Sequence, residues 1–273
     1  MAHPLPTFLA WLSSLLGRAA GDERVVREAE TMFGACRIFD THDGDGLPVR
    51  VLEVEGTWQS ATYLDDGWSE LVFPYHRHYN RLFEVAPDAQ DILMLGGGGF
   101  SYPKYLVTHH REVRVDVVEI DPAITRLASD YFYLDRIEEE HHALRDGRLR
   151  IFETDARAFL EGDVDGARPS YDAILNDCFS AGMPLASLAT AEGVHAIRKR
   201  LSPGGIYLAN VVSALEGPRS RPLRDVCAAL AGEFANVRVI ACGSDEPRLP
   251  DNNVVVARDA ALGLRGTYPL SRA

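Results

Sequence analysis

Short apolar runs alternate with segments of helical periodicity from Asp91 onward, and no other feature of the chain limits its fold as strongly. Strands that are apolar along their whole length are typical of a parallel sheet with helices on both faces. We predict strands over 92–95, 113–118, 149–152, 173–175 and 206–211, and helices over 102–108, 122–131, 156–160 and 190–201. This order predicts an α/β domain of Rossmann-like architecture.

The last two predicted strands are joined in a different way. Residues 237–241 and 253–257 are separated by a polar loop that contains prolines and lacks a helical pattern. Parallel strands need a crossover connection, usually a helix, so strands joined without one are expected to be antiparallel. We therefore predict a mostly parallel seven-stranded sheet that ends in a C-terminal antiparallel hairpin.

The first third of the chain does not follow this alternation. Runs over 37–39, 49–54 and 58–63 predict a small β-unit, and 70–84 resembles a helix. Apolar residues of 8–16 share one helical face, which predicts an amphipathic N-terminal helix, and 22–32 is predicted as a second helix. We divide the chain into an N-terminal helical segment (1–33), a small β-unit (34–69) and the Rossmann-like domain (70–273).

Charge limits the classes of partner. The chain has 28 Lys and Arg against 40 Asp and Glu, a net charge of −12, and its longest basic run is Arg198–Arg200. A surface this acidic repels phosphate backbones unless its basic groups are segregated. We therefore predict no nucleic-acid partner.

Cysteine usage and hydropathy indicate the compartment. Cys36, Cys178, Cys227 and Cys242 are scattered, without a CxxC pair or zinc-ligand spacing. This pattern favours neither a disulfide framework nor a metal site, and it predicts a reducing, cytoplasmic setting. The apolar run over 8–16 is too short to cross a bilayer, so we expect no integral membrane segment.

Chemistry-bearing residues follow the predicted strands in order. Gly96–Gly99 follows the first strand, Glu119 ends the second, Asp155 follows the third and Asp177 follows the fourth. Glycines let backbone N–H groups approach a ligand, and a carboxylate about 20 residues later can accept ribose hydroxyls. Each feature alone also fits a tight turn or a helix cap. Because the carboxyl ends of parallel strands share one edge, their ordered occurrence predicts a nucleoside pocket.

The glycine loop also limits the kind of nucleoside. Gly96-x-Gly98-x-x-Ser101 lacks the final Gly or Ala of the dinucleotide fingerprint, and the chain has no GxxxxGK[ST] phosphate loop. These departures favour an adenosyl-sulfonium donor over NAD or ATP.

At these segments the chain resembles the spermidine synthases, polyamine aminopropyltransferases built on the class I S-adenosylmethionine-dependent methyltransferase fold. The resemblance extends from about Arg50 to Ala257 and includes the small N-terminal β-unit around Val54–Gln59. The segments that carry it are Asp91–Gly99, Val117–Pro122, Thr154–Ala156, Tyr171–Asp177 and Leu201–Gly205.

The resemblance implies a role for several residues. It implies that Gly96, Gly97 and Gly98 wrap the donor, that Glu119 holds its ribose, and that Asp155 and Ala156 hold adenine. Asp177 would be the acidic residue beside the reacting amine. The acceptor pocket would be formed by Gln59, Tyr75, His76, Tyr79 and Ser180; for His76 a solvated helix face is the alternative. Dimers are usual in this family, so we expect a homodimer.

The sequence departs from the family at three places, one of which is Phe73-Pro74, where the synthases carry a Tyr-Gln pair near the acceptor. The synthases carry an Asp that grips the donor's amine where this chain has Gly99, and a second Asp follows the catalytic one where this chain has Ser180-Ala181. Our leading hypothesis is a transferase that moves an aminopropyl group from decarboxylated S-adenosylmethionine to a small-molecule acceptor such as a polyamine. The alternatives are an S-adenosylmethionine-dependent methyltransferase and a catalytically degenerate nucleoside-binding protein.

Overall fold

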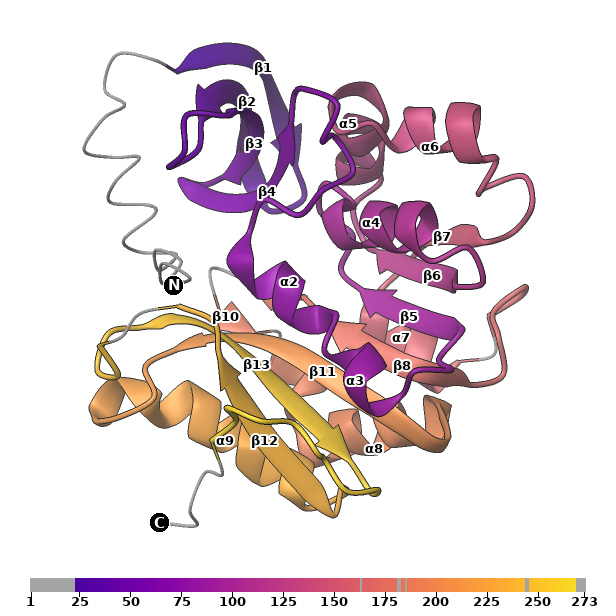
Figure 1. Cartoon of the computed structure of the whole chain (residues 1–273), viewed down its shortest axis with the longest axis vertical. Helices are drawn as coiled ribbons and strands as arrows, with labels where there is room; N and C mark the ends of the chain where they lie inside the picture. Colours follow the sequence, from indigo (N-terminus) through magenta and orange to yellow (C-terminus); the bar gives the residue numbers. More distant parts are fainter. Residues whose placement is uncertain (1–22, 163, 181–182, 185, 244–245, 269–273) are drawn as a thin grey trace.

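The structure, a computed structural model, describes residues 23–162, 164–180, 183–184, 186–243 and 246–268. A seven-stranded sheet forms its centre, in the spatial order β12-β13-β11-β8-β5-β6-β7 (Figure 1). The strands are β5 (Asp91–Leu95), β6 (Arg114–Glu119), β7 (Leu149–Glu153), β8 (Tyr171–Asn176), β11 (Leu201–Ser213), β12 (Asn236–Ala241) and β13 (Asp251–Arg258).

Strand directions confirm the predicted sheet. Strand β5 pairs in parallel with both β6 and β8, β6 with β7, and β8 with β11. Strand β13 runs antiparallel to β11 and to β12, as the C-terminal hairpin requires. The α/β, Rossmann-like class I methyltransferase fold with a small N-terminal β-unit is therefore confirmed.

Two layers of helices cover the large sheet. The helices are α2 (Pro74–Tyr79), α3 (Leu82–Val85), α4 (Ser101–His109), α5 (Pro122–Tyr131), α6 (Leu134–His141), α7 (Ala156–Glu161), α8 (Ala191–Arg200) and α9 (Arg221–Ala231). Side chains alternate along each strand, so Ile92 and Met94 share one core with α2, α4 and α6. Leu93 and Leu95 lie in the other core, with α7, α8 and α9. Both faces are covered, which explains why the strands are apolar throughout.

The N-terminal sheet is larger than predicted. It is antiparallel, in the order β1 (Arg24–Thr31), β2 (Gly34–His42), β3 (Pro48–Val54) and β4 (Thr57–Tyr63). The predicted helix over 22–32 is therefore wrong where the structure describes it. Val25 and Val26 are β-branched and favour a strand, and the turn at Gly34, with φ of +109°, returns the chain along β2. The predicted amphipathic helix over 8–16 lies outside the described residues.

The predicted helix over 70–84 is interrupted. Pro74 begins α2, because the proline ring suits the first helical turn and cannot continue a helix from upstream. Helix α2 ends at Tyr79, and α3 begins at Leu82. The short strands β9 (Phe179–Ser180) and β10 (Met183–Pro184), the 3-10 turns η1 (Ala186–Leu188) and η2 (Pro218–Ser220), and helices α6 and α9 were not predicted.

A buried polar seam joins the two sheets at α4. The Ser60 and Ser101 hydroxyls lie 2.9 Å apart, and the Ser101 hydroxyl also donates to the Ala61 carbonyl. Lys104 Nζ donates to Thr62 Oγ1 at 3.0 Å and to the Trp68 and Phe132 carbonyls. The seam holds β4 against the helix that follows the glycine loop. Among the described residues no helix is long and apolar enough to cross a membrane.

Lys104 should make stability depend on pH. It is 1% exposed, and burial lowers the pKa of its amino group from 10.5 to about 7. The unfolded chain therefore keeps this proton over a pH range in which the folded protein has lost it, so folding becomes more favourable as pH rises from 7 to 10. Relative to Lys104→Met, the wild type should gain on the order of a few kcal/mol over this range. Urea unfolding at pH 7, 8.5 and 10 measures this, and parallel curves for the two proteins would contradict it.

Candidate active site

The glycine loop connects β5 to α4 and needs its glycines. Gly96 has φ of +90°, and a Cβ added there would lie 2.7 Å from the Asp177 carbonyl oxygen. The loop is therefore packed directly on the backbone of Asp177. At Gly99 a Cβ would lie 2.7 Å from Ser60 Oγ and 3.1 Å from Phe132, so the N-terminal sheet occupies the space that an acidic side chain would need.

Glu119 ends β6 and faces the glycine loop. Its Oε2 accepts hydrogen bonds from the Gly97 and Gly98 N–H groups at 2.9 and 3.2 Å, and its Oε1 accepts one from Asp121 N–H. The residue is 6% exposed, and burial raises the pKa of its carboxyl group, with the three N–H donors acting in the opposite direction. The arrangement brings the predicted ribose carboxylate and the predicted donor loop into direct contact.

Asp155 and Ala156 lie at the start of α7, one strand further along the edge. Asp155 is the N-cap, and its Oδ1 accepts from Ala158 N–H at 2.9 Å. The thiol of Cys178 is buried nearby. Burial, together with the negative charges of Glu119, Asp177 and Asp155, holds the pKa of this thiol well above the ordinary range. The carboxylates of Glu119, Asp155 and Asp177 thus all lie near Cys178 at the carboxyl edge of the sheet.

The carboxylate of Asp177, one residue after β8, has three polar side chains within hydrogen-bond distance. Tyr75 Oη donates to Oδ2 at 2.9 Å, and His76 Nε2 lies 3.3 Å from the same oxygen. Asn210 Nδ2, from β11, donates to Oδ1 at 3.0 Å. The Asp177 side chain is 11% exposed, so solutes can still reach it. Burial and the Asp177 charge hold the pKa of the Tyr75 phenol well above its ordinary range, which keeps the phenol a donor.

His76 is buried, and the solvated-face alternative for it is wrong. The residue is 4% exposed, its ring lies 4.2 Å from the Tyr75 ring, and it stacks at longer range on Phe73 and Tyr102. Arg77, the next residue, is exposed and donates to the Leu71 carbonyl. Helix α2 therefore presents Tyr75 and His76 to Asp177 and Arg77 to solvent.

The remaining predicted acceptor residues are Tyr79, Gln59 and Ser180. Tyr79 is fully buried on α2, with its ring 5.8 Å from that of Tyr75. The Gln59 carbonyl oxygen lies 3.8 Å from the Cβ position of Gly98, so β4 borders the donor loop. The Ser180 backbone is in β9, and its side chain lies outside the described part of the structure. Asn210 was missed, although a lone amide in the apolar run 206–211 is a detectable signal.

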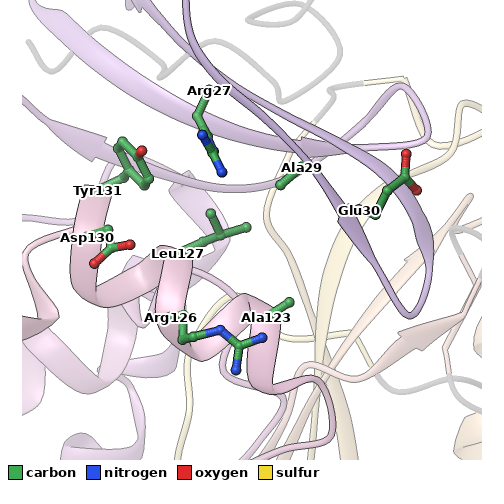
Figure 2. A pocket seen from close by; sticks show the side chains of 8 residues that line it. All are labelled: Arg27, Ala29, Glu30, Ala123, Arg126, Leu127, Asp130 and Tyr131. Carbon is green, nitrogen blue, oxygen red and sulfur yellow. The ribbon is translucent and has the colours of Figure 1, made fainter.

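A cavity of about 360 Å³ lies elsewhere, between β1 and α5 (Figure 2). Its lining residues are Arg27, Ala29, Glu30, Ala123, Arg126, Leu127, Asp130 and Tyr131. None of the predicted site residues lines it. Within the described ranges no group of three or more His, Cys, Asp or Glu side chains could hold a metal ion, and all four cysteines are free.

Comparisons with known proteins identify the family of the chain. The model of the spermine/spermidine synthase domain matches residues 75–229. A polyamine aminopropyltransferase of Vibrio vulnificus is 28% identical over 264 residues, which cover 95% of this chain and 81% of the relative. A probable polyamine aminopropyl transferase of Bifidobacterium longum is 26% identical over 81% of this chain, which spans only 45% of that relative.

A solved structure shows the same fold. A probable spermidine synthase from Corynebacterium glutamicum superposes with a TM-score of 0.70 at 22% identity, covering 88% of this chain and 82% of that one. The domain model matches more than half of the chain and includes the glycine loop, Glu119, Asp155 and Asp177. The chain therefore belongs to the spermine/spermidine synthase family.

Proposed function

We propose that the protein transfers an aminopropyl group from decarboxylated S-adenosylmethionine to the nitrogen of an amine. The observation that carries this proposal is the Asp177 carboxylate, held by Tyr75, His76 and Asn210 directly beside the glycine loop. A partly exposed carboxylate at the edge of a nucleoside pocket can bind a cationic acceptor next to the donor. Membership of the family and the aminopropyltransferase names of the relatives support the same reaction.

In this proposal the donor lies along the carboxyl edge of β5, β6 and β7. Gly96, Gly97 and Gly98 surround it, Glu119 accepts from its ribose hydroxyls, and Asp155 with Ala156 binds adenine. Ribose hydroxyls then replace the Gly97 and Gly98 N–H groups as partners of Glu119.

The chemistry is a displacement at carbon. An alkylamine has a pKa near ~10, so it arrives protonated and must lose a proton before its lone pair can attack. The nitrogen attacks the propyl carbon bound to sulfur, the C–S bond breaks, and its electron pair neutralises the sulfonium. Asp177 binds the acceptor nitrogen and accepts this proton as the base. Gln59, Tyr75, His76, Tyr79 and Ser180 surround the acceptor. The leaving group is methylthioadenosine.

We further propose that the protein works as a cytoplasmic homodimer. The usual assembly of the resembled family supports the dimer, and the four free cysteines support a reducing compartment. Light scattering after size-exclusion chromatography should give twice the 30.1 kDa chain mass. A mass of one chain would contradict the dimer.

Product analysis tests the reaction. Incubation with decarboxylated S-adenosylmethionine and putrescine should release methylthioadenosine and spermidine in equal amounts. With intact S-adenosylmethionine, formation of S-adenosylhomocysteine would instead support a methyltransferase. Thermal stabilisation by both sulfonium nucleosides without any product would support a nucleoside-binding protein.

Glu119→Gln should weaken donor binding. The amide keeps the shape of the side chain but loses the negative charge that strengthens hydrogen bonds to ribose hydroxyls. We expect donor Kd to rise about 10- to 100-fold, measured by calorimetry. Glu153→Gln is the matched control, because Glu153 pairs in register with Glu119 and is exposed. Equal affinities for both variants would remove Glu119 from the donor site.

A further inference from the structure

Asn252 is a polar residue at the start of an otherwise apolar strand, and no contact described above explains it. In β13 the residues Val254–Ala257 are fully buried, and Asn252 itself is only 5% exposed. Its side-chain amide has no hydrogen-bond partner among the described residues. Buried polar groups in proteins are nearly always hydrogen-bonded, so this amide needs an explanation.

The two neighbours of Asn252 have structural roles. Asn253 Nδ2 donates to the carbonyls of Ser213 and Asp251 at 2.8 and 2.9 Å. The Asp251 carboxylate packs against Gly243 and accepts from the Asn252 backbone N–H. Only the Asn252 amide is left without such a role. The completely buried unpaired atoms of the described chain do not include its amide atoms, so a solute can contact them.

Asn252 faces the same side of the sheet as the Asp177 carboxylate. Leu208 of β11 and Val254 of β13 belong to the core that includes α2. Side chains alternate along a strand, so Asn210 and Asn252, each two residues from one of these, point to that side as well. Asn210 donates to Asp177 there. Asn252 therefore lies on the acceptor side of the sheet.

The strand register gives the separation between the two side chains. Strand β8 pairs in parallel with β11, which brings Asp177 level with Asn210, and Asn210 pairs with Val254. Asn252 lies two residues further out on β13. Strands are about 4.8 Å apart and each residue advances about 3.4 Å, so the two Cα atoms of Asp177 and Asn252 lie roughly 12 Å apart. A short linear diamine spans the gap that the two side chains leave.

A second set of contacts connects Asn252 with α2. Cys242 N–H donates to the Asn252 carbonyl at 3.2 Å. The Cys242 thiol is one of the groups that raise the pKa of the Tyr75 phenol, so this thiol lies near the ring. The same phenol donates to Asp177. The register and these contacts therefore agree in placing Asn252 next to the acceptor site.

We propose that the Asn252 amide binds the second, non-reacting nitrogen of a diamine whose reacting nitrogen lies at Asp177. The inference rests on the aminopropyl transfer proposed above. Asn252 Oδ1 accepts a hydrogen bond from the distal ammonium, which gives the unpaired amide its partner. A neutral amide binds an ammonium less strongly than a carboxylate does. The site should therefore prefer a diamine over a monoamine only moderately.

Asn252→Val tests this role, because valine suits a strand and cannot bind the distal nitrogen. We expect KM for putrescine to rise about 10-fold, which is the loss of one hydrogen bond. KM for n-butylamine, which lacks the distal nitrogen, should stay within about 2-fold, and kcat for both amines within about 3-fold.

Asn252→Asp should act in the opposite direction. The carboxylate forms a charge-assisted hydrogen bond with the distal ammonium, so KM for putrescine should fall about 10-fold. KM for n-butylamine should again stay near the wild-type value, and melting temperatures show that both variants are folded.

A binding measurement separates this inference from the proposed reaction. Putrescine is titrated by calorimetry into each protein loaded with methylthioadenosine, which requires no turnover. Weaker putrescine binding by Asn252→Val, with n-butylamine unaffected, supports the inference. If the variant changes the binding of both amines equally, or of neither, Asn252 does not bind the distal nitrogen. If the wild type shows the selective binding but releases no methylthioadenosine, the proposed reaction fails and the binding site for the distal nitrogen stands.

Discussion

Asp177→Asn should lower kcat about 1,000-fold. The Asn side chain has nearly the same shape but no charge, so it neither binds the acceptor cation nor accepts its proton. Loss of a general acid–base group typically costs 10²- to 10⁴-fold. Release of methylthioadenosine under saturating donor measures the effect, because it counts every turnover directly.

Donor binding is the internal control for this variant. The loop contact at Gly96 involves the backbone carbonyl of residue 177, which the substitution leaves in place. Donor Kd and melting temperature should therefore remain within a few-fold and a few degrees of the wild type. A variant that binds donor normally and turns over at the wild-type rate would exclude Asp177 from the reaction.

Asp116→Ala should produce the largest loss of stability. Asp116 is fully buried in β6 and accepts from Arg150 Nε and Nη2 at 2.8 and 2.7 Å. It also accepts from Tyr171 Oη at 2.7 Å and forms an ion pair with Arg168. Removing one partner leaves two guanidinium groups without this buried counter-charge. Breaking a buried ion pair costs about 3–5 kcal/mol, and the melting temperature should fall roughly 10 °C.

Calorimetry or urea unfolding at pH 7 measures this change. Asp66→Ala, which removes an exposed carboxylate, is the control and should change the free energy of unfolding by less than about 0.5 kcal/mol. A loss below about 1 kcal/mol for Asp116→Ala would show that the network contributes little. Asp116 lies three residues before Glu119 on β6, so the folded fraction should keep its affinity for the donor.

The positions of the residues proposed to bind the donor could be predicted from sequence because these residues follow strands. Glu119 and Asp155 come at or after the ends of β6 and β7, and the glycine loop follows β5. In a parallel sheet these strand ends lie at one edge, independently of how the connecting helices pack on the sheet. Apolar runs and helical periods locate the strands, so the order of these residues along the chain already places them together.

The acceptor side could not be predicted in the same way. His76 and Arg77 are neighbours in one helix-like stretch, and the sequence does not show which of them is buried. Contact between α2 and the end of β8 buries His76 against Asp177 and leaves Arg77 exposed. Asn210 reaches Asp177 only because β11 pairs with β8. Such contacts join residues 33 to 101 positions apart and depend on packing.

The N-terminal sheet shows the same limit for secondary structure. Residues 24–31 have charges and small residues that also suit a helix, and pairing with β2 makes them a strand. Lys104 looks like an ordinary helix lysine in the sequence, and only the seam with β4 buries it.

The sequence by itself determined the Rossmann-like sheet, its family and the sheet edge that the glycine loop, Glu119 and Asp155 share, because periodicity and strand order are local properties of the chain. Only the tertiary structure decided the surroundings of Asp177 and the space at Gly99. Burial and hydrogen-bond partners there are set by which distant elements pack together. The filled space at Gly99 and the buried contact between His76 and Asp177 are consequences of that packing.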